Sequence, residues 1–72
     1  MGESIHSKEY REFIQKLIAA RLQAGLTQVQ VGQKLKKPQS YISKIERSER
    51  RIDIIELKRL LRVYKIDLAK FS

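Results

Sequence analysis

The chain has 72 residues, of which 16 are Lys or Arg and 8 are Asp or Glu, and its formal net charge at pH 7 is +8. This length suits one domain, near the lower limit at which a hydrophobic core stabilises a fold without disulfides or metals. The absence of cysteine excludes a disulfide framework and a thiolate metal site, while the basic surplus indicates a polyanionic partner, nucleic acid first and an anionic membrane second.

The first residues, Met1 to Ser7, are mostly polar and lack periodicity. We expect residues 1–7 to form a loosely ordered arm and residues 8–72 to form the domain. Basic N-terminal arms of other DNA-binding proteins enter grooves, but this one carries Glu3 and no Lys or Arg before Lys8. The sequence therefore favours a disordered end over a groove-binding arm.

A first helix is predicted between Ser7 and Gly25. Ser7 is a suitable N-cap, and Gly25 suits the left-handed position that ends many helices. Arg21 falls on the apolar flank, where an unpaired charge is costly, and Glu46 is its candidate partner, although both side chains could instead reach water. The residues expected in the core recur with a helical period: Tyr10, Phe13, Ile14, Leu17, Ile18 and Leu22.

A second helix is predicted to start after Thr27. Thr27 and Gln30 have the spacing of a capping box, and Leu26 and Val31 have the spacing of a hydrophobic staple. Val31 and Leu35 are expected to be buried. Gly32 lies on the same flank and lacks a side chain, which suits the close approach of another helix across a short turn.

A third helix is predicted to start at about Pro38 or Gln39, because the residue before proline leaves the helical region and proline is tolerated in a first turn. Ile42 and Ile45, with Tyr41 alongside, form its inward stripe. The opposite face carries only side chains with hydrogen-bond donors, namely Gln39, Ser40, Ser43, Lys44 and Arg47.

This polar face suits major-groove readout. Glutamine can bond an adenine edge bidentately, and lysine or arginine can bond guanine. The alternative is an ordinary solvated helix face. Between Lys36 and Arg51 there are six basic residues and only two acidic ones, Glu46 and Glu49, and the basic surplus lies at both ends of the helix, where phosphates would flank a helix in the groove. Such charge runs are usually only a solvated surface. The basic residues are Lys36, Lys37, Lys44, Arg47, Arg50 and Arg51.

A fourth helix follows the polar loop from Ser48 to Ile52. Asp53 and Glu56 form a second capping-box arrangement. The expected inner stripe is Ile54, Leu57, Leu60, Leu61 and Tyr64, and the outer side carries Lys58, Arg59, Arg62 and Lys65, which we interpret as a solvated face rather than a membrane-binding stripe.

The chain ends in a predicted helical turn capped by Asp67. Leu68 and Phe71 can fold back on the core, or they can form part of a dimer contact, and the sequence leaves both open.

The sequence offers little for catalysis. His6 is the only histidine, and no Gly-rich loop that cradles phosphate is present. Ser43 and Lys44 are adjacent, so on a helix they point in different directions and do not form a serine/lysine pair. We therefore expect no enzymatic activity, no cofactor and no metal.

Membrane attachment and export also lack support. No stretch is long and apolar enough to span a bilayer, and the N-terminus lacks the apolar core of a secretory signal. Met1-Gly2 begins like a myristoylation site, but His6 stands where that motif needs Ser or Thr. We expect a cytoplasmic location.

The segment from Leu26 to Arg50 resembles the helix-turn-helix of the lambdoid phage repressor, Cro and XRE family, and the resemblance extends over roughly Phe13 to Phe71. It implies an all-α, compact five-helix domain that binds operator DNA, usually as a dimer. It also implies a buried ion pair between Arg21 and Glu46. The residues that carry it are Leu26-Thr27-Gln28, Val31, Leu35, Gln39-Ser40, Tyr41 to Glu46 and Arg50.

This sequence departs from the family pattern at three positions. Lys36 stands where the turn usually has glycine, Pro38 where a Ser or Thr cap is usual, and Ser48 where glycine often follows the recognition helix.

Together, these features predict a sequence-specific DNA-binding transcriptional regulator of the repressor or controller type, acting as a homodimer on a palindromic operator. The expected partners are double-stranded DNA and a second copy, with no membrane and no small-molecule effector domain. A protein-interaction module on the same fold and a non-specific nucleic-acid binder remain alternatives. The predicted base contacts are Gln39, Ser40, Ser43 and Lys44, and the predicted backbone contacts are Gln28, Lys36, Lys37, Tyr41, Arg47, Arg50 and Arg51.

Overall fold

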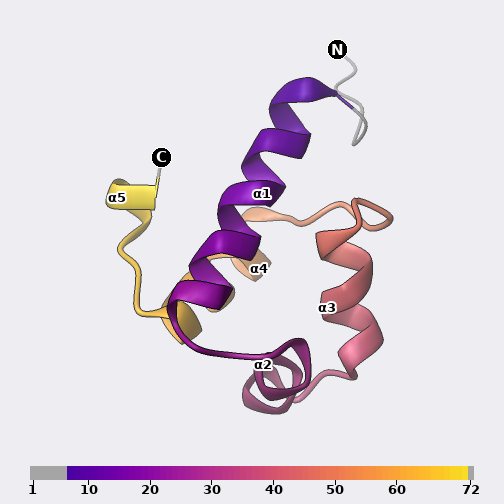
Figure 1. Ribbon diagram of the computed structural model, residues 1–72, viewed down its shortest axis with the longest axis vertical. Helices are drawn as coiled ribbons and strands as arrows, with labels where there is room; N and C mark the ends of the chain where they lie inside the picture. Colours follow the sequence, from indigo (N-terminus) through magenta and orange to yellow (C-terminus); the bar gives the residue numbers. More distant parts are fainter. Residues whose placement is uncertain (1–6, 72) are drawn as a thin grey trace.

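The computed structural model describes residues 7–71, which form five helices joined by short connections (Figure 1). The all-α, five-helix class predicted from the sequence is confirmed. Apart from Ser7, the predicted N-terminal arm and His6 lie outside the described residues. No helix within residues 7–71 combines the length and apolarity needed to cross a bilayer. The helices are α1 (Lys8–Gln23), α2 (Gln28–Leu35), α3 (Gln39–Glu46), α4 (Ile54–Tyr64) and α5 (Leu68–Phe71).

The longest helix, α1, runs through the middle of the view in Figure 1. The helices α2 and α3 follow each other across a tight turn and pack closely, while α5 lies on the opposite side of α1 from α3. The helix α4 passes behind α1 and supplies apolar side chains to the centre. This arrangement leaves one side of α3 without a neighbouring helix.

Side-chain caps fix where α1, α2 and α4 begin, whereas Pro38 before α3 makes no side-chain cap bond. The Ser7 hydroxyl accepts a hydrogen bond from the Tyr10 N–H at 3.1 Å. The capping box at Thr27 and Gln30 is confirmed, with reciprocal bonds of 3.1 and 2.8 Å. The second box, at Asp53 and Glu56, is confirmed as well. Each cap satisfies backbone donors that the first helical turn leaves without a partner.

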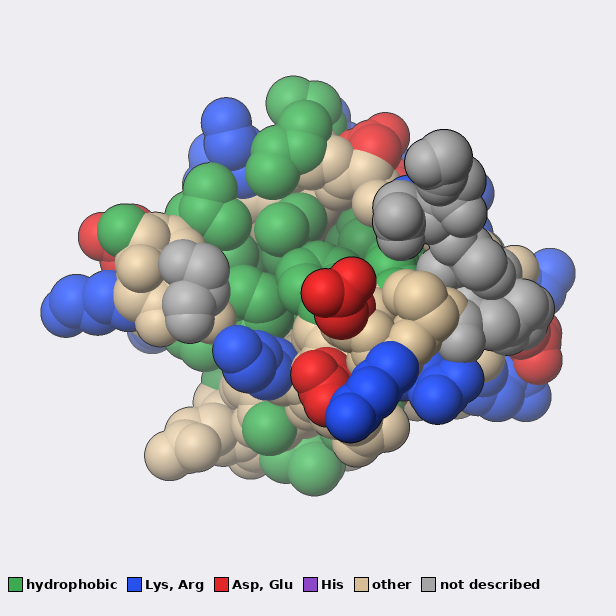
Figure 2. All heavy atoms as spheres, turned by 90° about the horizontal axis from the view of Figure 1, so that it is seen from above, with side chains coloured by type: hydrophobic (Ala, Val, Ile, Leu, Met, Phe, Trp, Pro, Cys, Tyr) green, Lys and Arg blue, Asp and Glu red, His purple; other side chains and the backbone are tan. Residues whose placement is uncertain are grey.

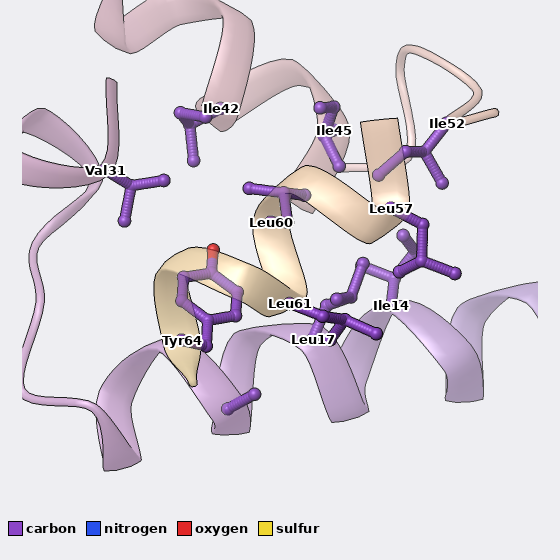
Figure 3. Close-up of a cluster of buried hydrophobic side chains, with 11 residues drawn as sticks. Ile14, Leu17, Val31, Ile42, Ile45, Ile52, Leu57, Leu60, Leu61 and Tyr64 are labelled. Atoms are coloured by element: carbon purple, nitrogen blue, oxygen red, sulfur yellow. The ribbon is translucent and has the colours of Figure 1, made fainter. Parts of the chain in front are cut away.

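The core lies where α1, α3 and α4 meet, with Val31 added from α2 (Figure 3). In that view, side chains of α4 project toward α1 on one side and toward Ile42 and Ile45 of α3 on the other. Two members, Ala20 and Ile52, were absent from the sequence prediction. The buried hydrophobic residues are Ile14, Leu17, Ala20, Val31, Ile42, Ile45, Ile52, Leu57, Leu60, Leu61 and Tyr64.

Two predicted core residues are exposed, and both predictions were wrong. Leu22 is 63% exposed, because the buried stripe of α1 passes through Ala20 and Arg21, and the next residue points about 100° further around the helix. Ile54 is 53% exposed. It keeps the period of the α4 stripe, but it is the first residue of that helix and no neighbouring element covers it.

The turn between α2 and α3 depends on a glycine inside α2 and a left-handed residue after it. A Cβ on Gly32 would lie 2.7 Å from the carbonyl oxygen of Lys37, so any larger residue would collide with the turn. Lys36 has φ 59°, and the Lys37 N–H then bonds the Gly32 carbonyl at 2.9 Å. Gly32 therefore makes room for the backbone of the turn.

Left-handed backbone also follows α3, at Ser48, with φ 60°. This conformation costs an ordinary residue about 1–2 kcal/mol, whereas glycine adopts it freely but loses more entropy on folding. We therefore expect Ser48→Gly to raise the free energy of unfolding by about 0.5–1 kcal/mol in urea titration. The control Ser48→Ala keeps the strain, so an equal gain there would contradict this explanation.

Candidate nucleic-acid interface

The helix α3 divides cleanly into a buried face and an exposed face. Ile42 and Ile45 are each 1% exposed and anchor the helix in the core. The residues of the opposite face predicted to contact bases are Gln39, Ser40 and Lys44, which are exposed, and Ser43, which is half-buried. The polar row is thus held outward by the burial of the apolar row behind it.

Basic side chains lie at both ends of this row. Lys36 and Lys37 precede α3, and Arg47, Arg50 and Arg51 follow it, and all of them are exposed. The Arg47 guanidinium lies 3.3 Å from Glu49, but both side chains are more than half exposed, so the pair is weak. The surface around α3 is therefore electropositive at both ends.

A nearly buried ion pair holds α3 against α1. The Nε and Nη2 groups of Arg21 donate to the two carboxylate oxygens of Glu46 at 2.7 and 3.1 Å, and Nη1 donates to the Leu26 carbonyl at 2.9 Å. The side chains of Arg21 and Glu46 are only 11% and 7% exposed. The hydrogen bond to Glu46 raises the pKa of Arg21 despite the opposing effect of burial.

Two glutamine side chains connect this ion pair by hydrogen bonds to the exposed face of α3. The Gln28 Nε2 donates to Glu46 at 2.8 Å, and the Gln28 Oε1 accepts from the Gln39 Nε2 at 2.9 Å. Gln39 keeps its own carbonyl oxygen and one amide hydrogen, which is the pair of groups that a bidentate contact to adenine uses. This link was not predicted from the sequence, although both glutamines stand first in their helices.

A second cluster links α3 to α4. The Tyr41 hydroxyl donates to the Glu56 carboxylate at 2.7 Å, and Arg50 donates to the same carboxylate oxygen. The Arg50 guanidinium lies 5.0 Å from the centroid of the Tyr41 ring, and the Lys37 ammonium lies 5.2 Å from it. The position of Arg50 is therefore set by an anion and by an aromatic face.

The protonation states of Tyr41 and Glu56 follow from these contacts. Burial raises the pKa of Tyr41, and the hydrogen bond to Glu56 adds to that rise, so the phenol stays a donor. Burial alone would raise the pKa of Glu56, but hydrogen bonds from Tyr41, the Asp53 N–H and Arg50 together lower it. Sequence spacing predicted Glu56 only as a cap, because its contact with Tyr41 joins residues 15 positions apart.

The ion pair gives a stability prediction. Glu46→Ala leaves the nearly buried Arg21 charge without its counter-ion and removes the acceptor of Gln28, so we expect a loss of about 3–5 kcal/mol in the free energy of unfolding. The matched control is Glu49→Ala, which breaks an exposed pair and should change stability by less than about 0.5 kcal/mol. A Glu46→Ala protein that melts like the parent would refute the assigned role.

The lowered pKa of Glu56 gives a pH prediction. A carboxyl whose pKa is lower when folded binds fewer protons in the native state, so its stabilisation is present above about pH 4.5 and is lost as the pH falls through the folded pKa. We expect Glu56→Gln to be less stable than the parent at neutral pH and the difference to shrink between about pH 5 and pH 3. Thermal melts across this range measure it. Glu49→Gln should show no such convergence, and a constant gap for Glu56→Gln would rule the explanation out.

Comparisons with known proteins agree with this geometry. A helix-turn-helix family model matches residues 17–71. A solved structure of an XRE-family like protein from Pseudomonas syringae pv. tomato str. DC3000 superposes with a TM-score of 0.86 and 37% sequence identity, covering 93% of this chain and 82% of that chain. A search of curated proteins found no match. The matched segment includes the whole of α2, α3 and α4, and the chain belongs to the XRE-type helix-turn-helix family of DNA-binding regulators.

Proposed function

We propose that the protein is a sequence-specific transcriptional regulator that inserts α3 into the major groove and acts as a homodimer on a palindromic operator. The observation that carries this proposal is the outward row of Gln39, Ser40 and Lys44 on a helix whose other face is buried. Because these side chains are not packed in the protein's own core, they are free to contact base edges.

The chemistry of the row suits direct readout. The free carbonyl and amide hydrogen of Gln39 match an adenine edge, and the Lys44 ammonium suits guanine. Ser40 and Ser43 have hydroxyls that both donate and accept, so they can serve either kind of base. Because Gln28 restrains Gln39 before binding, less side-chain entropy is lost when the contact forms.

The flanking residues suit phosphate. Gln28 stands at the start of α2, where free backbone N–H groups attract an anion, and its side-chain amide keeps one hydrogen. The remaining candidates for contacts with the DNA backbone lie in α3 or beside it, namely Lys36, Lys37, Tyr41, Arg47, Arg50 and Arg51. Tyr41 already donates its hydroxyl to Glu56, so its part is to position Lys37 and Arg50 through its ring.

A dimer follows from the size of the reading element. The helix α3 has 8 residues and reaches only a few base pairs. Two copies related by a two-fold axis would read half-sites about 34 Å apart, which multiplies the specificity. A repressor or controller role accords with a domain that reads DNA in this way.

Two substitutions distinguish base contacts from phosphate contacts by their effects on DNA binding. Gln39→Ala should cost about 1–3 kcal/mol of binding free energy and relax the preference at one base pair, whereas Arg50→Ala should weaken binding to all sequences similarly. Arg59→Ala, on the outer face of α4, is the charge-matched control and should change affinity little at physiological salt. Equal losses on all sequences for Gln39→Ala would argue against base readout.

Selection of bound duplexes from a random pool at physiological salt tests the proposal as a whole. A recovered palindrome would fix the half-site spacing and the need for two copies. Binding that falls steeply with salt but enriches no motif would favour non-specific coating, and the absence of salt-sensitive binding would favour a protein partner.

A further inference from the structure

The Glu56 carboxylate connects α3, the loop after it and the start of α4. Its Oε2 atom accepts hydrogen bonds from the Tyr41 hydroxyl at 2.7 Å and from the Arg50 guanidinium, and its Oε1 atom accepts one from the Asp53 N–H at 3.0 Å. The Glu56 side chain is 17% exposed, whereas that of Arg50 is 44% exposed. The carboxylate is thus fixed by three donors, and Arg50 is the partner that can turn toward solvent.

Two cations lie against the Tyr41 ring beside this carboxylate. The Lys37 ammonium and the Arg50 guanidinium lie 5.2 and 5.0 Å from the ring centroid. Among residues 7–71, Lys37 forms no ion pair, while Arg50 is paired with Glu56. The two side chains therefore offer different amounts of charge to a phosphate, although both are among the proposed contacts with the DNA backbone.

The carboxylate that holds Arg50 is ionised at neutral pH. Burial alone would raise the pKa of Glu56, but the three hydrogen bonds that it accepts lower it. An arginine uses the same N–H groups to bind a carboxylate and to bind a phosphate. Glu56 therefore occupies donors that a DNA phosphate would otherwise bind.

Pairing of this kind limits how much of the net charge of +8 is available to a polyanion. Figure 2 shows Asp and Glu side chains lying beside Lys and Arg side chains on one face of the molecule. In the loop after α3, Arg47 and Glu49 are both more than half exposed, so they separate at little cost. Glu56 is nearly buried and held in place, so its hold on Arg50 is the firmer one.

We propose that Glu56 lowers the affinity of the protein for DNA by competing with a backbone phosphate for the Arg50 guanidinium. The inference rests on the proposed function, since it requires the loop after α3 to face DNA. Arg50 either leaves the carboxylate for the phosphate, which exchanges one anion for another, or stays and leaves the phosphate without a cation. In both cases the binding free energy gains less than an unpaired arginine would supply.

This competition affects only the part of the affinity that is independent of sequence. Phosphate contacts carry no sequence information directly, whereas the proposed contacts of Gln39 and Lys44 are with bases. Base contacts therefore supply a larger share of the binding free energy than they would beside an unpaired arginine. Glu56 acts through Arg50 and does not touch DNA itself, so it is a positioning residue.

The variant that tests this inference is Glu56→Gln. Glutamine serves a capping box as glutamate does, but it has no charge to hold Arg50. In fluorescence anisotropy with a short duplex of random sequence, the dissociation constant should fall about two- to fivefold at about 50 mM salt, and the salt dependence should steepen by up to about one neutralised phosphate. A merely structural role predicts the opposite sign, since we expect Glu56→Gln to be less stable than the parent.

Matched controls isolate Arg50 from the change in net charge. Asp53→Asn removes the same charge from the start of the same helix, and asparagine is also a good N-cap, but Asp53 forms no ion pair within residues 7–71. Its effect on the dissociation constant should be smaller than that of Glu56→Gln. In an Arg50→Ala background, Glu56→Gln should have no more effect than Asp53→Asn has. Circular dichroism melts check that each variant folds.

The outcomes separate this inference from the proposed function. Tighter binding by Glu56→Gln that disappears in the Arg50→Ala background would support the inference. Weaker binding by Glu56→Gln would overturn it, because Glu56 would then hold Arg50 in place for the phosphate, and equal gains from Glu56→Gln and Asp53→Asn would overturn it as an effect of net charge. Duplex binding that Glu56→Gln leaves unchanged would overturn the inference alone, whereas a parent protein that binds no duplex at low salt would overturn the proposed function as well.

Discussion

The arrangement of α3 depends on one nearly buried guanidinium. Arg21 binds both oxygens of Glu46 and also the carbonyl of Leu26, so a single side chain fixes the end of α1, the entry to α2 and the end of α3. A buried ion pair adds little net stability compared with apolar packing, because desolvation offsets most of the attraction. What it adds here is orientation. Glu46 in turn holds Gln28, and Gln28 holds Gln39, so a chain of hydrogen bonds runs from the interior to the first exposed residue of α3.

The helices of the motif depend on such contacts because they are short. The helices α2 and α3 have 8 residues each, below the length at which an isolated helix is stable in water. The burial of Val31, Ile42 and Ile45 supplies the packing, and the capping box at Thr27 begins α2. Lys36 and Ser48, which stand where the family pattern has glycine, both adopt the left-handed conformation that glycine takes without strain. The turns that follow α2 and α3 therefore form with backbone strain at Lys36 and Ser48.

Local patterns in the sequence predict most of this fold, and the errors have physical causes. Helical periods, capping boxes and the Gly25 terminus involve residues within one or two turns of each other, so the sequence contains the whole signal. Periodicity also distinguishes the buried and exposed faces of α3. It fails at Leu22 because that residue points away from the buried stripe of α1, and at Ile54 because a period continues to the end of a helix, whereas burial needs a neighbouring element to cover that end. The contacts of Gln28 with Gln39 and of Tyr41 with Glu56 were not predicted, because they join side chains whose meeting depends on the angles between helices.

The carboxylates near α3 are each held by a cation of the protein itself. Arg21 neutralises Glu46, Arg50 neutralises Glu56, and Arg47 lies against Glu49. These pairs are not equivalent toward a phosphate. Arg21 is nearly buried, so it cannot reach a phosphate. Arg50 would have to exchange the Glu56 carboxylate for a phosphate oxygen, which is one anion for another, so the free energy that it gains from the phosphate is reduced. Within residues 7–71, Lys36 and Lys37 form no ion pair, and the Lys37 ammonium lies over the ring of Tyr41, so neither has an anion to give up there. In the proposed complex the turn before α3 therefore contributes more of the phosphate attraction per charge than the loop after it.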